Sequence, residues 1–260
     1  MKKDKDKIFT GGYAILKSND REVAEMPLKE ILAQNIHAVR ARMRAAEEKA
    51  GRAPGSVLLC AASKMNGADT VRLAAALDID VFGENRVQEL TEKQKAGAYL
   101  AKPLHFIGHL QTNKVKQVVG RAALIQSVDS VRLAEAVEKE AAKQGIVQDV
   151  LLEVNIGGEA GKSGVPPQEL QRLAEACAAC AHVRVKGLMA VPPAADAPGE
   201  NRRRFAQMYG LFRRLGEWGY DNVTPQVLSM GMSGDLENAI LEGSTMVRVG
   251  TAIFGARNYP

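Results

Sequence analysis

Eight short apolar segments, each separated from the next by a helical pattern, restrict the fold of this chain more than any other feature. Their length is typical of strands, and their nearly continuous apolar character indicates burial on both faces of a sheet. In order they span residues 57–64, 80–83, 104–107, 124–128, 149–155, 183–189, 226–229 and 246–249. This alternation predicts one α/β domain, a parallel (β/α)8 barrel of the TIM type.

The chain has 260 residues, which is enough for one such barrel and too few for a second substantial domain. Residues 28–50 have apolar side chains at a helical period and charged side chains on the opposite face. Little chain follows the eighth predicted strand, so we expect this extra N-terminal helix to help cover the barrel wall. Residues 1–25 lack such a pattern; we expect a disordered N-terminal extension there, and the barrel in residues 26–260.

The composition argues against several classes of protein. The net charge of +5 is small for this length, and Arg202–Arg204 fall on the polar face of an amphipathic helical pattern, so we predict no nucleic-acid binding. We also predict no membrane span, no signal peptide and no metal site, because the long apolar runs and ligand clusters that these require are missing. Cys177 and Cys180 fit two small core residues better than a redox pair. The three cysteines lack the spacing of a disulfide framework, so we expect a reducing, cytoplasmic compartment. We also expect a monomer.

Lys64 stands at the end of the first predicted strand, between a run of small and apolar residues and the turn at Asn66-Gly67. Partial burial there would lower the pKa of its ammonium group and leave some neutral amine, which can attack a carbonyl and form a Schiff base. The alternative is a lysine that leaves the strand and extends to water. This segment alone favours neither reading.

Polar residues and glycines follow most of the predicted strands, at the end of a barrel where active sites are built. Two of these segments, residues 229–234 and Gly250-Thr251, combine glycines with hydroxyl side chains. Such loops can bring backbone N–H groups close to an anion, and the loops after strands seven and eight are the usual phosphate position in this fold. Together they predict a phosphate site that includes Ser229 and Ser233.

Arg248 lies within the last predicted strand, between two valines. A buried guanidinium is costly unless it meets a partner, and it only donates hydrogen bonds. Next to a heteroaromatic nitrogen it would keep that nitrogen unprotonated. The alternative is an arginine that points outward to a carboxylate on a helix. With a Schiff-base lysine and a phosphate site, the inward reading predicts a pocket for pyridoxal 5′-phosphate (PLP).

The chain closely resembles the pyridoxal phosphate homeostasis proteins, the YggS-like family, over residues 28–259. The motifs of this resemblance are residues 62–64 (ASK), 82–85 (FGEN), 105–111 (HFIGHLQ), 186–189 (KGLM), 228–233 (LSMGMS) and 243–255 (GSTMVRVGTAIFG). The resemblance implies a barrel like the N-terminal domain of alanine racemase. It also implies a protein that buffers or delivers PLP without efficient catalysis, with apo forms of PLP-dependent enzymes as candidate recipients.

The resemblance further implies a role for each residue of the cofactor site. Lys64 would be the cofactor lysine, Arg248 would lie at the pyridine nitrogen, and Asn85 would contribute from the 82–85 motif. The phosphate would be held by Ser229, Ser233, Gly250 and Thr251. This chain departs from the common family pattern directly after Lys64, where members have Thr-Lys-Pro and this sequence has Met65-Asn66-Gly67.

Three other functions stay open at this point. A PLP-dependent racemase-like enzyme would use the same lysine and the same cofactor. A Schiff-base aldolase acting on a sugar phosphate would use Lys64 and the phosphate loops but would give Arg248 no role. A nucleic-acid-binding module would use only the arginines at 202–204.

Overall fold

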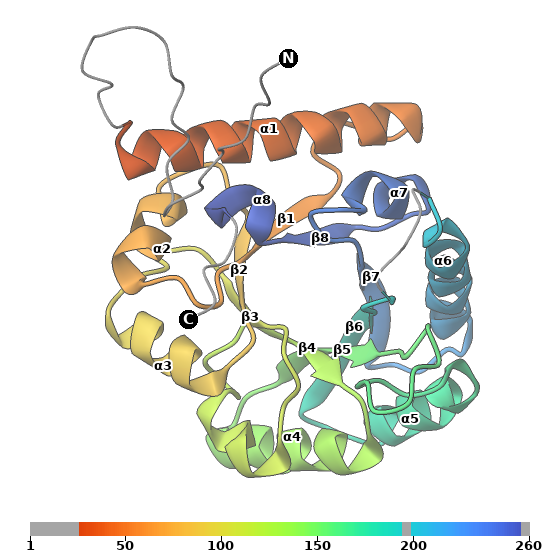
Figure 1. Cartoon of the computed structure of the whole chain (residues 1–260). Helices are drawn as coiled ribbons and strands as arrows, with labels where there is room; N and C mark the ends of the chain where they lie inside the picture. The colour runs from red at the N-terminus through yellow and green to blue at the C-terminus, as the bar shows by residue number, and fades with distance from the viewer. Residues whose placement is uncertain (1–25, 194–198, 256–260) are drawn as a thin grey trace, which may run out of the picture.

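The computed structural model describes residues 26–193 and 199–255. Our expectation for residues 1–25 concerns a segment outside these ranges and stays a prediction. Within them, parallel strands pair in chain order and close into a barrel (Figure 1), which confirms the predicted fold class. The strands are β1 (Leu58–Ala62), β2 (Val81–Glu84), β3 (Leu104–Phe106), β4 (Leu124–Val128), β5 (Gln148–Glu153), β6 (Val183–Met189), β7 (Val223–Ser229) and β8 (Met246–Val249).

Helices surround the barrel and pack their apolar faces on its outer wall. They are α1 (Leu28–Lys49), α2 (Ala68–Ala75), α3 (Val87–Lys95), α4 (Val131–Gln144), α5 (Leu170–Ala178), α6 (Arg202–Glu217), α7 (Leu236–Leu241) and α8 (Thr251–Phe254), with 3-10 turns η1 (Thr112–Gln117) and η2 (Pro167–Glu169). The α4 helix illustrates the local signals: Ser130 Oγ accepts a hydrogen bond from the Leu133 N–H (3.3 Å), and Gly145 ends the helix at a φ of 66°.

Several elements differ from the sequence-based expectation: β1 ends at Ala62 and β5 at Glu153, each two residues before the predicted end. The segment after β3 forms the 3-10 turn η1 rather than an α-helix. Strand β7 begins at Val223, three residues before the predicted start, because Val223 already pairs with Val185 of β6; the pairing register then shifts before Gly187. Pro225, which cannot donate to a regular ladder, is accommodated in this irregular stretch.

The N-terminal helix α1 lies across the outside of the barrel beside α2, α7 and α8 (Figure 1). Asn35 Nδ2 donates to the Ile253 carbonyl of α8 at 2.9 Å, and Arg42 pairs with Glu237 of α7 at 2.6 Å. Helix α8 has only four residues. The prediction that α1 helps to cover the wall near the last strand is therefore confirmed.

The interior of the barrel changes character along its axis. Apolar side chains fill one part, in two clusters made of Cys60, Val81, Ile107 and Met246 and of Leu124, Leu151 and Met189. Toward the C-terminal ends of the strands the buried side chains are polar, among them Gln126, Glu153, Ser229 and Arg248. The functional site is therefore to be sought at that end.

Candidate functional site

Lys64 follows directly after β1 and is half-buried. The Ser63 N–H before it donates to the Gly83 carbonyl of β2 at 3.0 Å, so the strand continues in register up to the lysine. Met65 after it has a φ of 65°, which turns the chain away from the strand. Lys64 thus stands just beyond the C-terminal end of β1, and its role as a Schiff-base lysine stays a prediction.

The neighbouring strands bring the other predicted segments to the same place. Cys60 of β1 pairs with Arg248 of β8, and Ala62 pairs with Gly83 of β2. A Cβ atom built on Gly250 would lie 3.2 Å from the Ala62 carbonyl oxygen, so a larger residue there would press on β1. The end of β1 therefore lies between the segment after β2 and the loop after β8.

Arg248 points into the barrel, not outward to a helix, and only 5% of its surface is exposed. Its Nη1 donates to Ser229 Oγ (2.6 Å) and its Nη2 donates to the Ala190 carbonyl (2.9 Å). Among the residues that the structure describes, no carboxylate lies within 4 Å of this guanidinium to form an ion pair. Burial lowers the pKa of Arg248 from its ordinary value, but an arginine in a protein stays protonated. The site therefore contains a positive charge that a ligand can meet.

A directional chain of hydrogen bonds leads from Arg248 across the interior. Ser229 Oγ donates onward to Gln126 Oε1 at 2.7 Å, and Gln126 Nε2 lies 3.0 Å from His105 Nδ1. Burial lowers the pKa of His105 to about 4, so its imidazole is neutral at physiological pH. Since Gln126 Nε2 can only donate, His105 Nδ1 accepts and the ring proton resides on Nε2. Every step of the chain runs in one direction, from Arg248 to His105.

The loops after β7 and β8, which we predicted to hold a phosphate, are joined to each other. Ser233 Oγ accepts a hydrogen bond from the Ala252 N–H at 3.3 Å, and the Arg248 N–H donates to the Gly231 carbonyl at 2.9 Å. Gly231 has a φ of 93°, and a Cβ there would lie 2.5 Å from the Ala239 Cβ. Glycine is thus required for this loop to fold back beside β8.

The predicted residues gather at the C-terminal ends of four adjacent strands, β8, β1, β2 and β7. They are Lys64, Asn85, Ser229, Ser233, Arg248, Gly250 and Thr251. Arg248 and Ser229 are joined by the hydrogen bond described above. Asn85 Oδ1 is a buried oxygen with no hydrogen-bond partner among the described residues. An orphaned acceptor costs free energy unless a ligand satisfies it, so this residue set fits a bound polar group.

Two interior residues escaped the sequence-based search for site residues. Gln126 links Ser229 to His105, and Glu153 ends β5 with only 7% of its surface exposed. Glu153 Oε2 has no partner among the described residues. Burial raises the pKa of Glu153 to about 7, the charge of Asp129 adds to this increase, and Arg248 opposes it. The sequence signal that could have identified Gln126 and Glu153 is a polar residue within an otherwise apolar strand.

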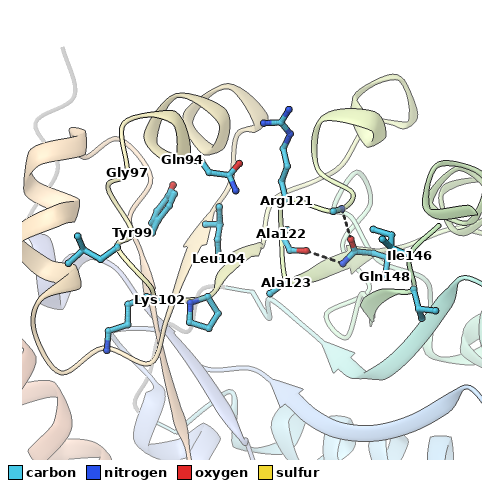
Figure 2. Close-up of a pocket in the computed structure, with 14 residues that line it drawn as sticks. Gln94, Gly97, Tyr99, Lys102, Leu104, Arg121, Ala122, Ala123, Ile146 and Gln148 are labelled. Carbon is cyan, nitrogen blue, oxygen red and sulfur yellow. Dashed lines mark hydrogen bonds between the residues drawn. The ribbon is translucent and has the colours of Figure 1, made fainter. Parts of the chain in front are cut away.

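A separate cavity of about 440 Å³ opens at the opposite end of the barrel (Figure 2). Its lining includes Leu104 at the start of β3 and Gln148 at the start of β5. Gln148 accepts from the Gly120 N–H and donates to the Ala122 carbonyl, as the dashed lines in Figure 2 indicate. This cavity contains none of the seven predicted site residues.

The sequence features that we set aside have ordinary surroundings. Cys177 is buried with its pKa raised to about 12, and Cys180 is half-buried; both are free thiols. Arg202 is exposed and pairs with Glu242. Within residues 26–193 and 199–255, no helix is long and apolar enough to cross a membrane, and no cluster of His, Cys, Asp and Glu could hold a metal ion.

Comparison with known proteins gives matches over most of the chain. Residues 34–258 match the family described as alanine racemase, N-terminal domain. The pyridoxal phosphate homeostasis protein of Aquifex aeolicus is 43% identical over 226 residues, which are 87% of this chain and 98% of that protein. The protein of the same name from Escherichia coli K12 is 39% identical, over 88% of this chain and 97% of its own length.

Solved structures agree with these matches. PipY of Synechococcus elongatus, determined with PLP bound, is 32% identical and superposes with a TM-score of 0.75, covering 86% of this chain and all of PipY. The alanine racemase of Streptomyces lavendulae is 22% identical with a TM-score of 0.69, covering 86% of this chain and 58% of the racemase chain. The racemase likeness concerns the fold alone.

Proposed function

This chain belongs to the family of pyridoxal phosphate homeostasis proteins, and we propose that it binds PLP at the mouth of its barrel and buffers or delivers it within the cell. The observation on which this proposal depends most is the buried Arg248. Its guanidinium has no ion-pair partner in the described part of the chain and lies at the same strand ends as Lys64. A site of this kind is suited to a ligand that is both anionic and able to accept hydrogen bonds.

We propose one role for each part of the site. Lys64 would attach the aldehyde of PLP reversibly as a Schiff base, with release of one water molecule. Ser233, Gly250 and Thr251, in the joined loops after β7 and β8, would hold the phosphate. Arg248 would lie at the pyridine nitrogen and donate to it, which keeps that nitrogen unprotonated. The bound PLP would contribute its aldehyde and its conjugated ring.

Two further residues have proposed roles in the same site. Ser229 is held between Arg248 and Gln126, so its hydroxyl is fixed in orientation and we assign it to the phosphate side of the pocket. The orphaned Asn85 Oδ1 would accept a hydrogen bond from the cofactor. We also propose a cytoplasmic location and a monomeric state, with apo forms of PLP-dependent enzymes as recipients.

The experiment that tests this function begins with the absorption spectrum of the purified protein. A protein-bound PLP gives a yellow protein, and we expect the colour to disappear in Lys64→Ala. The yellow protein should then reactivate an apo form of a PLP-dependent enzyme. A colourless wild-type protein that takes up no added PLP would contradict the proposal.

The alternative is a racemase-like enzyme that uses the same site, and the shared barrel fold supports testing it. We propose that the chain is not an efficient racemase, since racemisation requires a second acid/base group facing Lys64 across the cofactor. Exchange of the α-hydrogen of L-alanine and of other amino acids with solvent measures this. Turnover of about 1 per second or faster, abolished in Lys64→Ala, would favour the enzyme.

A further inference from the structure

A second group of polar side chains, most of them buried, lies on the outside of the barrel wall, next to the Lys64 segment. It consists of Glu84 at the end of β2, Glu89 and Lys93 on α3, and Tyr99 in the loop after α3. We call these four residues the α3 cluster. None of them was among the residues predicted to bind the cofactor, and Glu84, Lys93 and Tyr99 are each at most 5% exposed.

Glu84 is the centre of the α3 cluster. Its Oε1 accepts hydrogen bonds from Ser63 Oγ (2.6 Å), Lys93 Nζ (2.8 Å) and Tyr99 OH (3.1 Å). Burial raises the pKa of Glu84, while Lys93 and Ser63 oppose that increase. A carboxylate with three donors on one oxygen fixes the directions of all three. Ser63, the residue before Lys64, is therefore held by its side chain.

Lys93 binds the backbone of Ser63 as well. Its Nζ donates to the Ser63 carbonyl at 2.8 Å, in addition to its ion pairs with Glu84 and with Glu89 (3.0 Å). The three donor hydrogens of the ammonium group thus have three acceptors. Because Ser63 is bonded at both its side chain and its carbonyl, the backbone entering Lys64 cannot rotate without breaking a buried hydrogen bond.

Glu89 holds the residue after Lys64. Its Oε2 accepts a hydrogen bond from the Met65 N–H at 2.6 Å, and the same oxygen receives Lys93 Nζ. Met65 has a φ of 65°, an uncommon value for a residue with a long side chain, and 49% of its surface is exposed. Packing of the Met65 side chain therefore does not impose this backbone conformation. A positive φ at such a residue is strained and persists only where the surrounding structure enforces it.

We propose that Glu84, Glu89 and Lys93 are positioning residues that fix the direction of Lys64 toward the cofactor by holding the backbone on both of its sides. This inference rests on the proposed function, because it concerns how the attaching lysine is presented. The residues on each side of Lys64 are bonded to groups outside the barrel, so the α3 cluster can orient Lys64 without occupying the pocket. Residues of helix α3, outside the barrel, thus influence the site by fixing the backbone on each side of Lys64.

The test uses the full-length chain free of PLP and a series of α3 variants. Glu89→Ala removes the acceptor for the Met65 N–H, Glu89→Gln retains an amide oxygen at that place, and Glu92→Ala is the matched control on the exposed face of the same helix. The first readout is the rate at which trypsin cleaves the native chain after Lys64. The second readout is the dissociation constant for PLP.

We expect Glu89→Ala to raise the cleavage rate after Lys64 about tenfold and to weaken PLP binding by a similar factor, as loss of a hydrogen bond to a charged group implies. Glu89→Gln should recover most of both losses, and Glu92→Ala should match the wild type. A general loss of folding is distinguishable, since it would increase cleavage throughout the chain. Lys93→Met should give the same local effect, and hydrogen exchange at the Met65 amide measures it independently.

Two results would overturn different parts of this account. Unchanged cleavage after Lys64 and unchanged PLP affinity in Glu89→Ala would overturn the positioning role while leaving PLP binding in place. A wild-type protein that binds no PLP would overturn the proposed function, whatever the cleavage pattern of the variants.

Discussion

The barrel wall separates two buried polar groups that differ in how their charges are balanced. Inside, hydrogen bonds connect Arg248 through Ser229 and Gln126 to a neutral His105, and we call these four residues the inner chain. No carboxylate lies within 4 Å of the Arg248 guanidinium in the described ranges. Outside, Lys93 pairs with both Glu84 and Glu89. The charged end of the inner chain has no ion-pair partner in the described ranges, whereas the charges of the outer cluster are paired, although Glu84 Oε2 accepts no hydrogen bond from the described residues.

This difference indicates what each group is for. A buried charge without a nearby counter-charge costs the fold free energy but attracts an anionic ligand, so the inner chain is suited to binding rather than to stability. A buried pair with good geometry is costly to break because the remaining partner is left uncompensated. The outer cluster is therefore suited to holding a backbone in place. Removing a charge from either group should separate these two roles.

The largest effect on stability is expected from Lys93→Met, which leaves Glu84 buried beside an apolar side chain. The free energy of unfolding should fall by about 3 kcal/mol, with the loss growing as pH rises and Glu84 loses its proton. In Arg248→Met, Ser229 Oγ and the Ala190 carbonyl each lose a donor, but the cost of burying an unpaired charge is also removed. The net loss of stability should therefore be only about 1 kcal/mol, whereas PLP binding should weaken at least about tenfold. Urea denaturation and PLP titration of both variants measure the contrast.

The double variant Glu84→Gln with Lys93→Met is the control for that contrast. It removes both charges of the Glu84–Lys93 pair and leaves only the less buried Glu89 charged. Most of the stability lost in Lys93→Met should therefore return, even though the hydrogen bond to the Ser63 carbonyl does not. If Arg248→Met proved more destabilising than Lys93→Met, the distinction between an unpaired charge in the inner chain and paired charges in the outer cluster would be wrong.

The next largest effect is on the pH dependence of stability, to which two buried groups inside the barrel contribute. The pKa of one is lowered and the pKa of the other is raised. His105 has a folded pKa of about 4 against an ordinary 6.5, so its contribution to stability is lost as pH falls from 6.5 to 4. Glu153 has a folded pKa of about 7 against an ordinary 4.5, so it destabilises the fold increasingly as pH rises from 4.5 to 7. Between pH 4.5 and 6.5 the two slopes oppose each other.

Glu153→Gln should remove the contribution of Glu153 to the pH dependence of the free energy of unfolding. The contribution of His105 should then be visible by itself. At pH 8 the PLP-free variant should be more stable than the wild type by about 3 kcal/mol, the equivalent of a shift of about 2.5 pKa units. The advantage should vanish near pH 4.5, so the variant loses stability more steeply on acidification. Urea denaturation across this pH range checks the profile, and parallel curves for the two proteins would refute the assignment.

A smaller loss is expected from Gln126→Leu, which interrupts the inner chain without changing any charge. It leaves the Ser229 hydroxyl and His105 Nδ1 without their buried partner, at a cost of about 2 kcal/mol. Leu and Gln have similar volumes, so packing should change little. Thermal unfolding measures the loss, and a variant as stable as the wild type would show that the chain is not continuous.

The smallest effect is expected from Arg42→Met, which removes an ion pair on the surface of α1. Arg42 pairs with Glu237 and also donates to the Ser233 carbonyl in the loop after β7. Both side chains of the pair are more than one-third exposed, so the loss of stability should be about 0.5 kcal/mol. A loss as large as that of Lys93→Met would mean that surface charges matter as much as the buried cluster.

The sequence was sufficient to predict the barrel and to nominate a site at one of its ends, whose role in binding stays a prediction. Buried parallel strands have a distinctive apolar pattern, and barrel sites lie at the strand ends, so Lys64, Asn85, Ser229 and Gly250 could be selected from their positions alone. Strand β7 was less predictable. Its first residues surround Pro225 in an irregular register that the β6 partner determines, and the partner is not visible in a local pattern.

The two buried polar groups could not be predicted because each joins residues from distant parts of the chain. Gln126 meets Ser229 from 103 positions away, and Lys93 meets Ser63 from 30 positions away. A glutamine inside an apolar strand or a lysine in a charged helix is compatible with many surroundings. Only the closed barrel, which fixes which strands are neighbours, determines that these side chains meet.

The central claim, that Lys64 is the residue that holds PLP, is tested most directly by borohydride reduction of the PLP-loaded protein followed by peptide mapping. Trypsin does not cleave after a modified lysine, so attachment at Lys64 should yield one peptide spanning residues 53–72 with the added phosphopyridoxyl mass. In unmodified protein the same region should give separate peptides 53–64 and 65–72. The label on any other lysine, with residues 53–72 cleaved normally, would contradict the account.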